Sequence, residues 1–163
     1  YENAIEQTIE TIEAIREINM PTFWFWPNVD IGSDSVSKAI RVYREKYMLK
    51  NFHFYKNFEP DDFLKLINNS KCLIGNSSVG IRESSFLGVP VVNIGNRQNR
   101  RLKGENVRNC EYNRKDIIDS INFHLNNNHK YESENIYGDG FSSKKIVEIL
   151  ASWEMTFHKT ITY

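Results

Sequence analysis

The chain has 163 residues, of which 21 are Lys or Arg and 21 are Asp or Glu, so its formal net charge is zero. A chain of this length can form one domain with a buried core, because roughly two-thirds of the unfolded surface is buried at this size. Zero net charge argues against a general nucleic-acid binder and requires any anion site to be local. No apolar run approaches the roughly 20 residues that span a bilayer, so we expect no membrane partner.

The cysteines and histidines do not point to a metal or a redox centre. Cys72 and Cys110 lie in apolar segments and have neither metal-ligand nor C-x-x-C spacing, and no carboxylate cluster suits Mg²⁺. We therefore expect no metal, no cofactor and two reduced thiols, as in a cytoplasmic protein. The chain opens with Tyr1 and enters a helical pattern without a cap, which favours an excised piece of a longer protein.

Short apolar runs alternate with amphipathic segments along the whole chain. The expected helices cover residues 3–18, a segment capped by Ser33 or Asp34, a segment starting at Pro60, residues 78–87, a segment capped by Asn113, and a segment from 142 past 153. The expected strands are residues 22–26, 52–55, 71–75, 90–94 and 107–110. This alternation predicts a single α/β domain with a Rossmann-like parallel sheet and helices on both faces.

The unusual polar clusters all follow predicted strands. They are residues 27–30, 55–59, 75–78 and 95–104. Ligands of parallel sheets bind outside the carboxyl ends of the strands, so these four loops are expected to face one cleft.

The stretch IGNSSVGIRE, residues 74–83, is the densest of these clusters. Its glycines have the spacing of a P-loop, but Ile81 and Arg82 stand where that motif requires Lys and then Ser or Thr. The stretch does pass from a buried strand into a predicted helix, whose first amides lack intrahelical partners and attract anions.

Four residues of this stretch suit a nucleoside phosphate. Ser77 and Ser78 would donate from their hydroxyls, Gly80 would let phosphate oxygens approach the backbone, and the Glu83 carboxylate could accept both hydroxyls of a ribose. Alternatively, Ser77 or Ser78 is only a helix N-cap and Glu83 is a surface residue.

A basic loop follows the predicted strand at 90–94. It carries Arg97, Arg100, Arg101 and Lys103 within seven residues. Arginine binds phosphate oxygens in a bidentate manner, so the loop could complete an anion site. A solvated loop is the plain alternative, and a nucleic-acid patch is a weaker one at zero net charge.

Taken together, the motifs GNSSVGIRESSFLGVPVVNIGNRQ, GENV, PNVD and NIYGDG resemble the C-terminal half of the UDP-N-acetylglucosamine 2-epimerases over about residues 1–153. The likeness is greatest to the hydrolysing branch of sialic-acid-type biosynthesis. It implies one half of a glycosyltransferase-B-type two-domain fold, with residues 1–163 as the UDP-binding domain. The partners it implies are UDP, a UDP-N-acetylhexosamine and an N-terminal catalytic domain, with an oligomer possible.

The resemblance also implies a reaction and roles for single residues. Such enzymes eliminate UDP across C1 and C2 of UDP-N-acetylglucosamine to give a glycal, and then add water to release UDP and N-acetylmannosamine. Ser77 and Ser78 would hold the diphosphate, Glu83 the ribose hydroxyls and Arg97 the rest of the nucleotide pocket; Asn28 would line the cleft, and the backbone of residues 55–58 would read the uracil edge.

This chain departs from its relatives at two positions of the basic loop and lacks their catalytic half. Relatives usually carry Gly where Arg100 stands and Glu where Leu102 stands, which changes the contacts of that loop. Their acid-base carboxylates lie in the N-terminal domain, so we assign no catalytic residue here and expect this piece to bind without turnover. Two other hypotheses remain open: the donor-nucleotide-binding domain of a glycosyltransferase, and a non-enzymatic module that binds anions or a partner.

Overall fold

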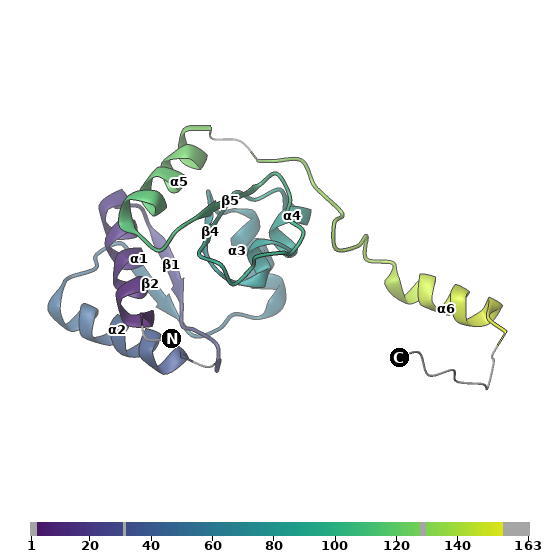
Figure 1. The fold of residues 1–163 in the computed structure, drawn as a ribbon, viewed down its shortest axis with the longest axis horizontal. Helices are drawn as coiled ribbons and strands as arrows, with labels where there is room; N and C mark the ends of the chain where they lie inside the picture. The colour runs from purple at the N-terminus through teal and green to yellow at the C-terminus, as the bar shows by residue number, and fades with distance from the viewer. Residues whose placement is uncertain (1–2, 31, 128–129, 155–163) are drawn as a thin grey trace, which may run out of the picture.

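The computed structural model of the chain describes residues 3–30, 32–127 and 130–154 (Figure 1). The helices are α1 (Ala4–Ile18), α2 (Ser33–Lys46), α3 (Pro60–Asn68), α4 (Glu83–Leu87), α5 (Arg114–Asn127) and α6 (Ser142–Ser152), with a 3₁₀ turn η1 (Ser78–Gly80) before α4. The strands are β1 (Thr22–Phe25), β2 (Phe52–Tyr55), β3 (Leu73–Gly75), β4 (Val91–Ile94) and β5 (Val107–Cys110). All predicted elements are present within a few residues, except that the predicted helix 78–87 is divided.

The strands are parallel throughout, which confirms the predicted α/β class. They form two hydrogen-bonded ladders, β1-β2 and β3-β4-β5, where the sequence predicted one sheet. The second ladder ends at β3. This strand has three residues and, among the described strands, pairs with β4 alone. A single hydrophobic cluster nevertheless underlies both ladders, since Trp24 of β1 and Val92 of β4 pack in it together.

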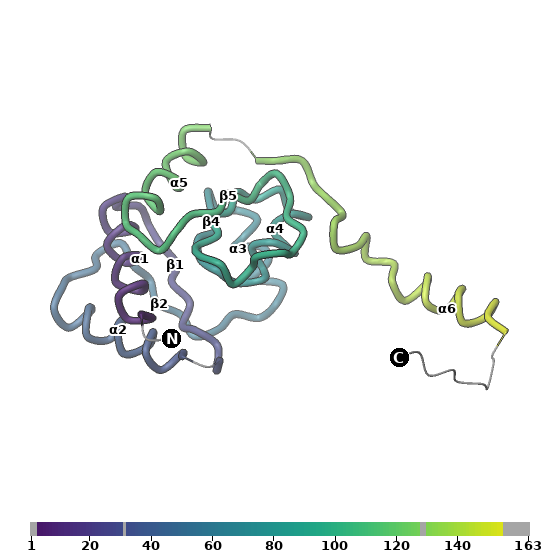
Figure 2. The backbone as a smooth tube through the Cα atoms, viewed as in Figure 1, coloured from purple at the N-terminus to yellow at the C-terminus, as the bar shows by residue number. Residues whose placement is uncertain are grey.

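Helices cover both faces of the strands, as the sequence predicted. On one face, α1 and α5 pack over β4, with Ala14 and Ile117 against Val92 in the same cluster (Figures 1 and 2). On the other face η1 approaches β4, where Gly80 lies against Val91. All four residues of β4 are consequently buried.

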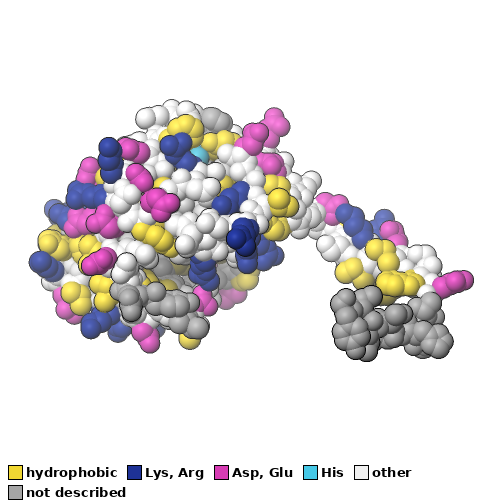
Figure 3. Space-filling view, in the orientation of Figure 1, with side chains coloured by type: hydrophobic (Ala, Val, Ile, Leu, Met, Phe, Trp, Pro, Cys, Tyr) yellow, Lys and Arg dark blue, Asp and Glu magenta, His cyan; other side chains and the backbone are white. Residues whose placement is uncertain are grey.

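The chain after α5 runs along the outside of the body and then leaves it. The amide of Tyr131 donates to the Gly88 carbonyl at 2.9 Å, and the hydroxyl of Tyr137 donates to the Leu102 carbonyl at 2.8 Å. Beyond these contacts α6 stands apart from the body (Figures 1 and 2). None of its residues is buried, and its apolar side chains form a strip that is visible in Figure 3. Among the described helices, none combines the length and the hydropathy needed to cross a bilayer.

Candidate functional site

Three of the four loops predicted to share a cleft are joined at the carboxyl ends of the strands. The Gln98 side chain, in the loop after β4, donates from Nε2 to the carbonyl of Asn76, which follows β3, at 2.7 Å. Next to Gln98, Arg97 forms an ion pair with Asp30 after β1, at 3.0 Å between Nη2 and Oδ2. Loops that belong to both ladders are thus held together, and they carry Ser77, Ser78, Arg97 and Asn28.

The Tyr55 carbonyl at the end of β2 accepts from the amide of Trp26, directly after β1, at 2.9 Å, but within the described residues the turn that follows makes no hydrogen bond to this group. Its Phe58 ring packs on Phe25 and Tyr55, with ring centroids 5.4 and 4.9 Å apart. A role for residues 55–58 in reading the uracil edge therefore stays a prediction.

The segment after β3 differs from the long helix that the sequence predicted. Ser77 caps the 3₁₀ turn, and its Oγ accepts from the Val79 amide at 3.4 Å. The Ser77 carbonyl accepts from the amide of Gly80 at 3.1 Å. The expectation of unpaired amides over the whole turn is therefore wrong for Val79 and Gly80. In the described structure the amides of Ser77 and Ser78 make no hydrogen bond, so these two remain able to bind an anion.

Gly80 has a packing role that the sequence did not predict. It is buried, and a Cβ at this position would lie 3.0 Å from Cγ1 of Val91. A small residue is favoured here because the turn packs closely against β4, and the approach of phosphate oxygens to Gly80 stays a prediction.

Glu83 lies at the start of α4 and is half-buried. Its Oε2 atom is buried and makes no hydrogen bond with the described residues. Burying a carboxylate oxygen without a donor costs free energy, so this atom can accept from a hydrogen-bond donor that the described residues do not supply.

Gln98 is a site residue that the sequence reasoning missed. The residue is 3% exposed, and while its Nε2 holds Asn76, its Oε1 is a second buried acceptor without a partner. Its place in the GNRQ motif, directly after Arg97, is the signal that could have identified it.

Of the basic residues predicted to bind an anion in this loop, Arg97 is the one whose side chain reaches the neighbouring loop after β1. Its side chain is 56% exposed and, through Asp30, leans towards the loop that also carries the exposed Asn28. Lys103 is engaged with β5, since its Nζ donates to Oδ1 of Asn109 at 3.0 Å. Arg100 adopts a left-handed backbone with φ of +64°, a conformation that glycine takes more readily.

The described residues contain no group of three or more His, Cys, Asp or Glu side chains placed to hold a metal ion. The two cysteines are free thiols, as predicted. Burial raises the pKa of the Cys72 thiol to about 12 and that of Cys110 to about 11, so neither is a reactive thiolate near neutral pH.

A parallel α/β unit with serines, a buried carboxylate and an arginine at one edge belongs to the class that binds ligands outside the strand ends. The profile of the family described as UDP-N-acetylglucosamine 2-epimerase matches residues 1–151. The chain therefore belongs to the UDP-N-acetylglucosamine 2-epimerase family, as its motifs suggested.

Individual relatives agree with this assignment. The UDP-N-acetylglucosamine 2-epimerase of Neisseria meningitidis serogroup B is 29% identical over 140 residues, which are 82% of this chain and 36% of the relative. The hydrolysing UDP-N,N'-diacetylbacillosamine 2-epimerase of Legionella pneumophila is 30% identical over 139 residues, 85% of this chain and 36% of the relative. The chain thus spans about a third of the length of these relatives.

A solved structure shows the same fold. It is the crystal structure of Methanocaldococcus jannaschii UDP-GlcNAc 2-epimerase in complex with UDP-GlcNAc and UDP, which superposes with a TM-score of 0.72 at 18% identity. The superposition covers 93% of this chain and 41% of that chain.

Proposed function

We propose that this chain is the UDP-binding unit of a hydrolysing UDP-N-acetylglucosamine 2-epimerase. The observation that supports this most directly is the buried Oε2 of Glu83, which has no donor in the described structure. The two vicinal hydroxyls of a ribose supply two donors to one carboxylate, so a nucleoside can satisfy the hydrogen-bonding requirement of Glu83. A simple anion would instead be repelled by the carboxylate charge.

The diphosphate then lies over the turn that precedes Glu83. The unpaired amides and the hydroxyls of Ser77 and Ser78 are its donors, and Arg97 supplies a guanidinium from the neighbouring loop. We assign Asn28, an exposed residue of the loop that carries Asp30, to the lining of the cleft. Each of these groups donates a hydrogen bond or carries a positive charge, and a diphosphate needs both.

For the complete protein we propose conversion of UDP-N-acetylglucosamine and water to N-acetylmannosamine and UDP. The step that breaks the C1–O bond to UDP also removes the C2 proton and gives a glycal, to which water then adds. The acid-base groups come from the other half of the protein, since the residues assigned here bind the nucleotide. Membership of the family, together with the hydrolysing relative in Legionella, supports this reaction over sugar transfer to an acceptor. The free thiols agree with a cytoplasmic enzyme that supplies a sialic-acid-type pathway.

We also propose that α6 packs against that other half. The exposed strip consists of Ile146, Ile149 and Leu150 of α6 and of Trp153 directly after it, each 55–65% exposed, and their spacing is that of one helical face. An amphipathic helix of this kind is stable when its apolar face is covered, and in the described chain the body does not cover it (Figure 3). The relatives are nearly three times longer than the matched region, so they contain ample chain to do so.

Titration calorimetry of the 163-residue chain with UDP tests the nucleotide assignment. Binding is expected, and Glu83→Ala should weaken it by about 1 to 3 kcal/mol because the ribose loses its hydrogen bonds. The same variant should bind 2',3'-dideoxy-UDP as the wild type does. Glu45→Ala, which removes an exposed carboxylate from α2, is the matched control and should change nothing. If Glu83→Ala binds UDP normally, a non-specific anion module becomes the better description.

The reaction is tested with the complete protein in D₂O. Elimination followed by hydration should release N-acetylmannosamine that carries solvent deuterium at C2, which proton NMR detects. Transfer of the sugar to an added acceptor, with no epimerised free sugar, would instead indicate a glycosyltransferase.

A further inference from the structure

The side chain of Gln98 holds one particular peptide group of the proposed nucleotide site. Gln98 is 3% exposed, and its Nε2 donates to the carbonyl of Asn76 at 2.7 Å. In a trans peptide group the carbonyl and the amide point in opposite directions, because the group is planar. The amide that shares this peptide group with the Asn76 carbonyl is that of Ser77. Since the carbonyl is held towards the buried Gln98, the Ser77 amide points away from it, and Ser77 itself is exposed.

This orientation leaves the Ser77 amide available to a ligand. In the described structure that amide makes no hydrogen bond, whereas the amides of Val79 and Gly80 donate to Ser77 itself. If the peptide group were rotated by half a turn, the amide would face Gln98 and the carbonyl oxygen would face the cleft. A carbonyl oxygen in that position would repel a diphosphate, whereas an amide attracts it. The direction of one peptide group thus decides what the turn after β3 offers to phosphate.

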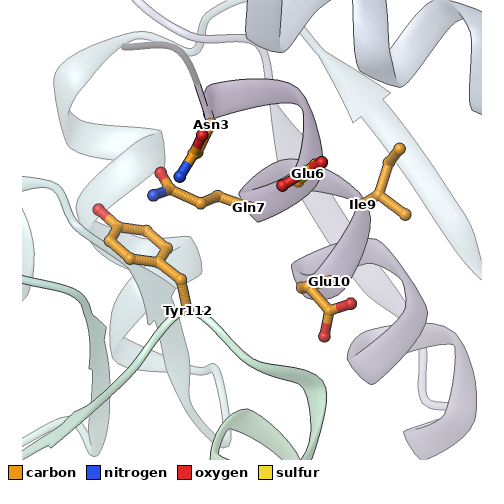
Figure 4. A pocket seen from close by; sticks show the side chains of 6 residues that line it. All are labelled: Asn3, Glu6, Gln7, Ile9, Glu10 and Tyr112. Atoms are coloured by element: carbon orange, nitrogen blue, oxygen red, sulfur yellow. The ribbon is translucent and has the colours of Figure 1, made fainter.

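Asn76 is also held by its side chain, but less firmly. Its Nδ2 donates to the Tyr112 hydroxyl oxygen at 3.5 Å, which is long for a hydrogen bond. Tyr112 lies in the turn after β5, and its hydroxyl is turned towards Asn3 and Gln7 at the start of α1 (Figure 4). The bond from Gln98 is shorter, and it comes from a buried side chain. The orientation of the peptide group is therefore set by Gln98 rather than by Tyr112.

The second polar atom of the Gln98 side chain is left unused. Oε1 is buried and makes no hydrogen bond with the described residues. If this position only had to be filled, an apolar residue of similar size would avoid the cost of burying that oxygen. The glutamine is stabilised here through its donor, so the bond to the Asn76 carbonyl is the property of Gln98 that matters for the site.

We propose that Gln98 is a positioning residue of the diphosphate site, which orients the peptide group between Asn76 and Ser77 so that the Ser77 amide faces the phosphates. The proposal rests on the proposed function, because it is the diphosphate that the Ser77 amide binds. Gln98 does not touch the nucleotide and acts through Ser77. The neighbouring Arg97 is more than half exposed, so the loop after β4 supports the diphosphate with a charge from its outer side and with a fixed peptide group from its buried side.

The test compares the binding of UDP with the binding of uridine, which has no phosphate. Gln98→Leu removes the donor and keeps a side chain of similar size. NMR titration of the 163-residue chain should show that this variant binds UDP about tenfold more weakly than the wild type, because one donor to the diphosphate is lost, and binds uridine equally well. The Ser77 amide resonance should shift when UDP is added to the wild type and should shift much less in the variant.

Asn106→Leu is the matched control. It also removes a buried side-chain amide that donates to a backbone carbonyl at 2.7 Å, in this case the carbonyl of Val89. Both variants lose a buried hydrogen bond of the same kind, so both should be less stable than the wild type. Asn106→Leu should nevertheless keep the wild-type ratio of UDP affinity to uridine affinity.

Gln98→Glu gives a readout that a loss of packing would not change. A protonated carboxyl can donate to the Asn76 carbonyl, whereas an ionised carboxylate cannot. Relative to the wild type at the same pH, this variant should bind UDP weakly at pH 8 and recover at pH 5. The deficit of Gln98→Leu should be the same at both pH values, and because leucine has no charge, this variant separates the lost donor from charge repulsion.

Two results would overturn the role of Gln98 and leave the proposed function standing. One is that Gln98→Leu binds UDP as tightly as the wild type, or loses UDP and uridine affinity in equal proportion. The other is that the deficit of Gln98→Glu does not depend on pH, a result that decides the matter even if Gln98→Leu does not fold. If the wild type binds no UDP, the proposed function fails, and the role of Gln98 fails with it.

Discussion

Arg97 donates from Nη2 to Oδ2 of Asp30 at 3.0 Å, across the boundary between the two strand ladders. Both side chains are more than half exposed, so the pair contributes little to stability but fixes where the guanidinium stands before a ligand arrives. In the proposed site Arg97 must share or leave Asp30 in order to bind the diphosphate. Asp30 is therefore a competitor of the ligand for the same cation.

We predict that Asp30→Asn strengthens UDP binding by about two- to fivefold, since the competing charge is removed and the Arg97 guanidinium is free to bind the diphosphate. Arg97→Ala should weaken binding by about tenfold, and Arg97→Lys should recover only part of this loss because lysine lacks the bidentate fork. Calorimetry at low and at physiological salt measures each effect. Weaker binding in Asp30→Asn would show that the carboxylate positions the arginine for the ligand rather than competing with it.

Arg100 provides a prediction about stability. Its φ of +64° is strained for a residue with a side chain, at a cost of roughly 1 to 2 kcal/mol. Arg100→Gly should therefore raise the free energy of unfolding by up to about 1 kcal/mol, after the greater backbone entropy of glycine in the unfolded chain is taken into account. Arg101→Gly is the matched control, because Arg101 has no positive φ and the same change there should only destabilise. Urea unfolding of the three proteins compares them directly, and equal destabilisation by both glycines would show that Arg100 is not strained.

Much of the fold could be predicted because local and tertiary preferences agree. Pro60 begins α3 as expected of a residue whose missing N–H is not needed in the first turn. Gly88 ends α4 in the left-handed conformation, with φ of +63°. The apolar run at 90–94 became the fully buried strand β4, as continuous apolar runs in parallel sheets do.

The divided helix could not be predicted from the sequence. Two contacts shorten it: Gly80 lies directly on Val91, and the Ser85 hydroxyl is shared between the carbonyl of Ile81 and the side chain of Asn106. Val91 and Asn106 come from other parts of the chain, so no helical period reveals these two partners. The same holds for the ion pair of Asp30 and Arg97, which are 67 positions apart in the chain.

The site was predicted in part. The clustering of polar loops at strand ends follows from the parallel topology, and the joined loops after β1, β3 and β4 agree with it. Which amides remain unpaired depends on the type of turn, and a 3₁₀ turn uses the amide of Gly80 where a longer helix would have left it open.

The Cys72 thiol makes the free energy of unfolding of the chain depend on pH in the alkaline range. The thiol packs against the main hydrophobic cluster, where burial raises its pKa from 9.0 to about 12. In the unfolded chain it ionises near pH 9, so above this pH the unfolded state binds fewer protons and the free energy of unfolding falls. The contribution is fully present below about pH 9 and is lost as the pH rises towards 12.

We predict that the stability of the wild type falls between pH 9 and pH 11 more steeply than that of Cys72→Ala, by at most about 1.4 kcal/mol per pH unit. Urea unfolding at several pH values measures both slopes, and Tyr and Lys titrations cancel in the comparison. The Cys72 thiol should also resist alkylation at pH 8 in the folded protein. Parallel slopes for the two proteins would show that the thiol is solvated rather than buried.

Gly95 and Tyr112 should be strongly coupled in their effect on stability. Gly95 has a φ of +74°, and a Cβ there would lie 2.0 Å from Cε2 of Tyr112, so Gly95→Ala combines backbone strain with a steric clash. We expect it to lower the free energy of unfolding by more than about 2 kcal/mol. Adding Tyr112→Ala removes the clash and leaves only the backbone strain, so the double variant should be less destabilised than the sum of the single variants. A double-mutant cycle by urea unfolding measures the coupling; strict additivity would mean that the ring moves aside freely and does not hold the loops after β4 and β5 together.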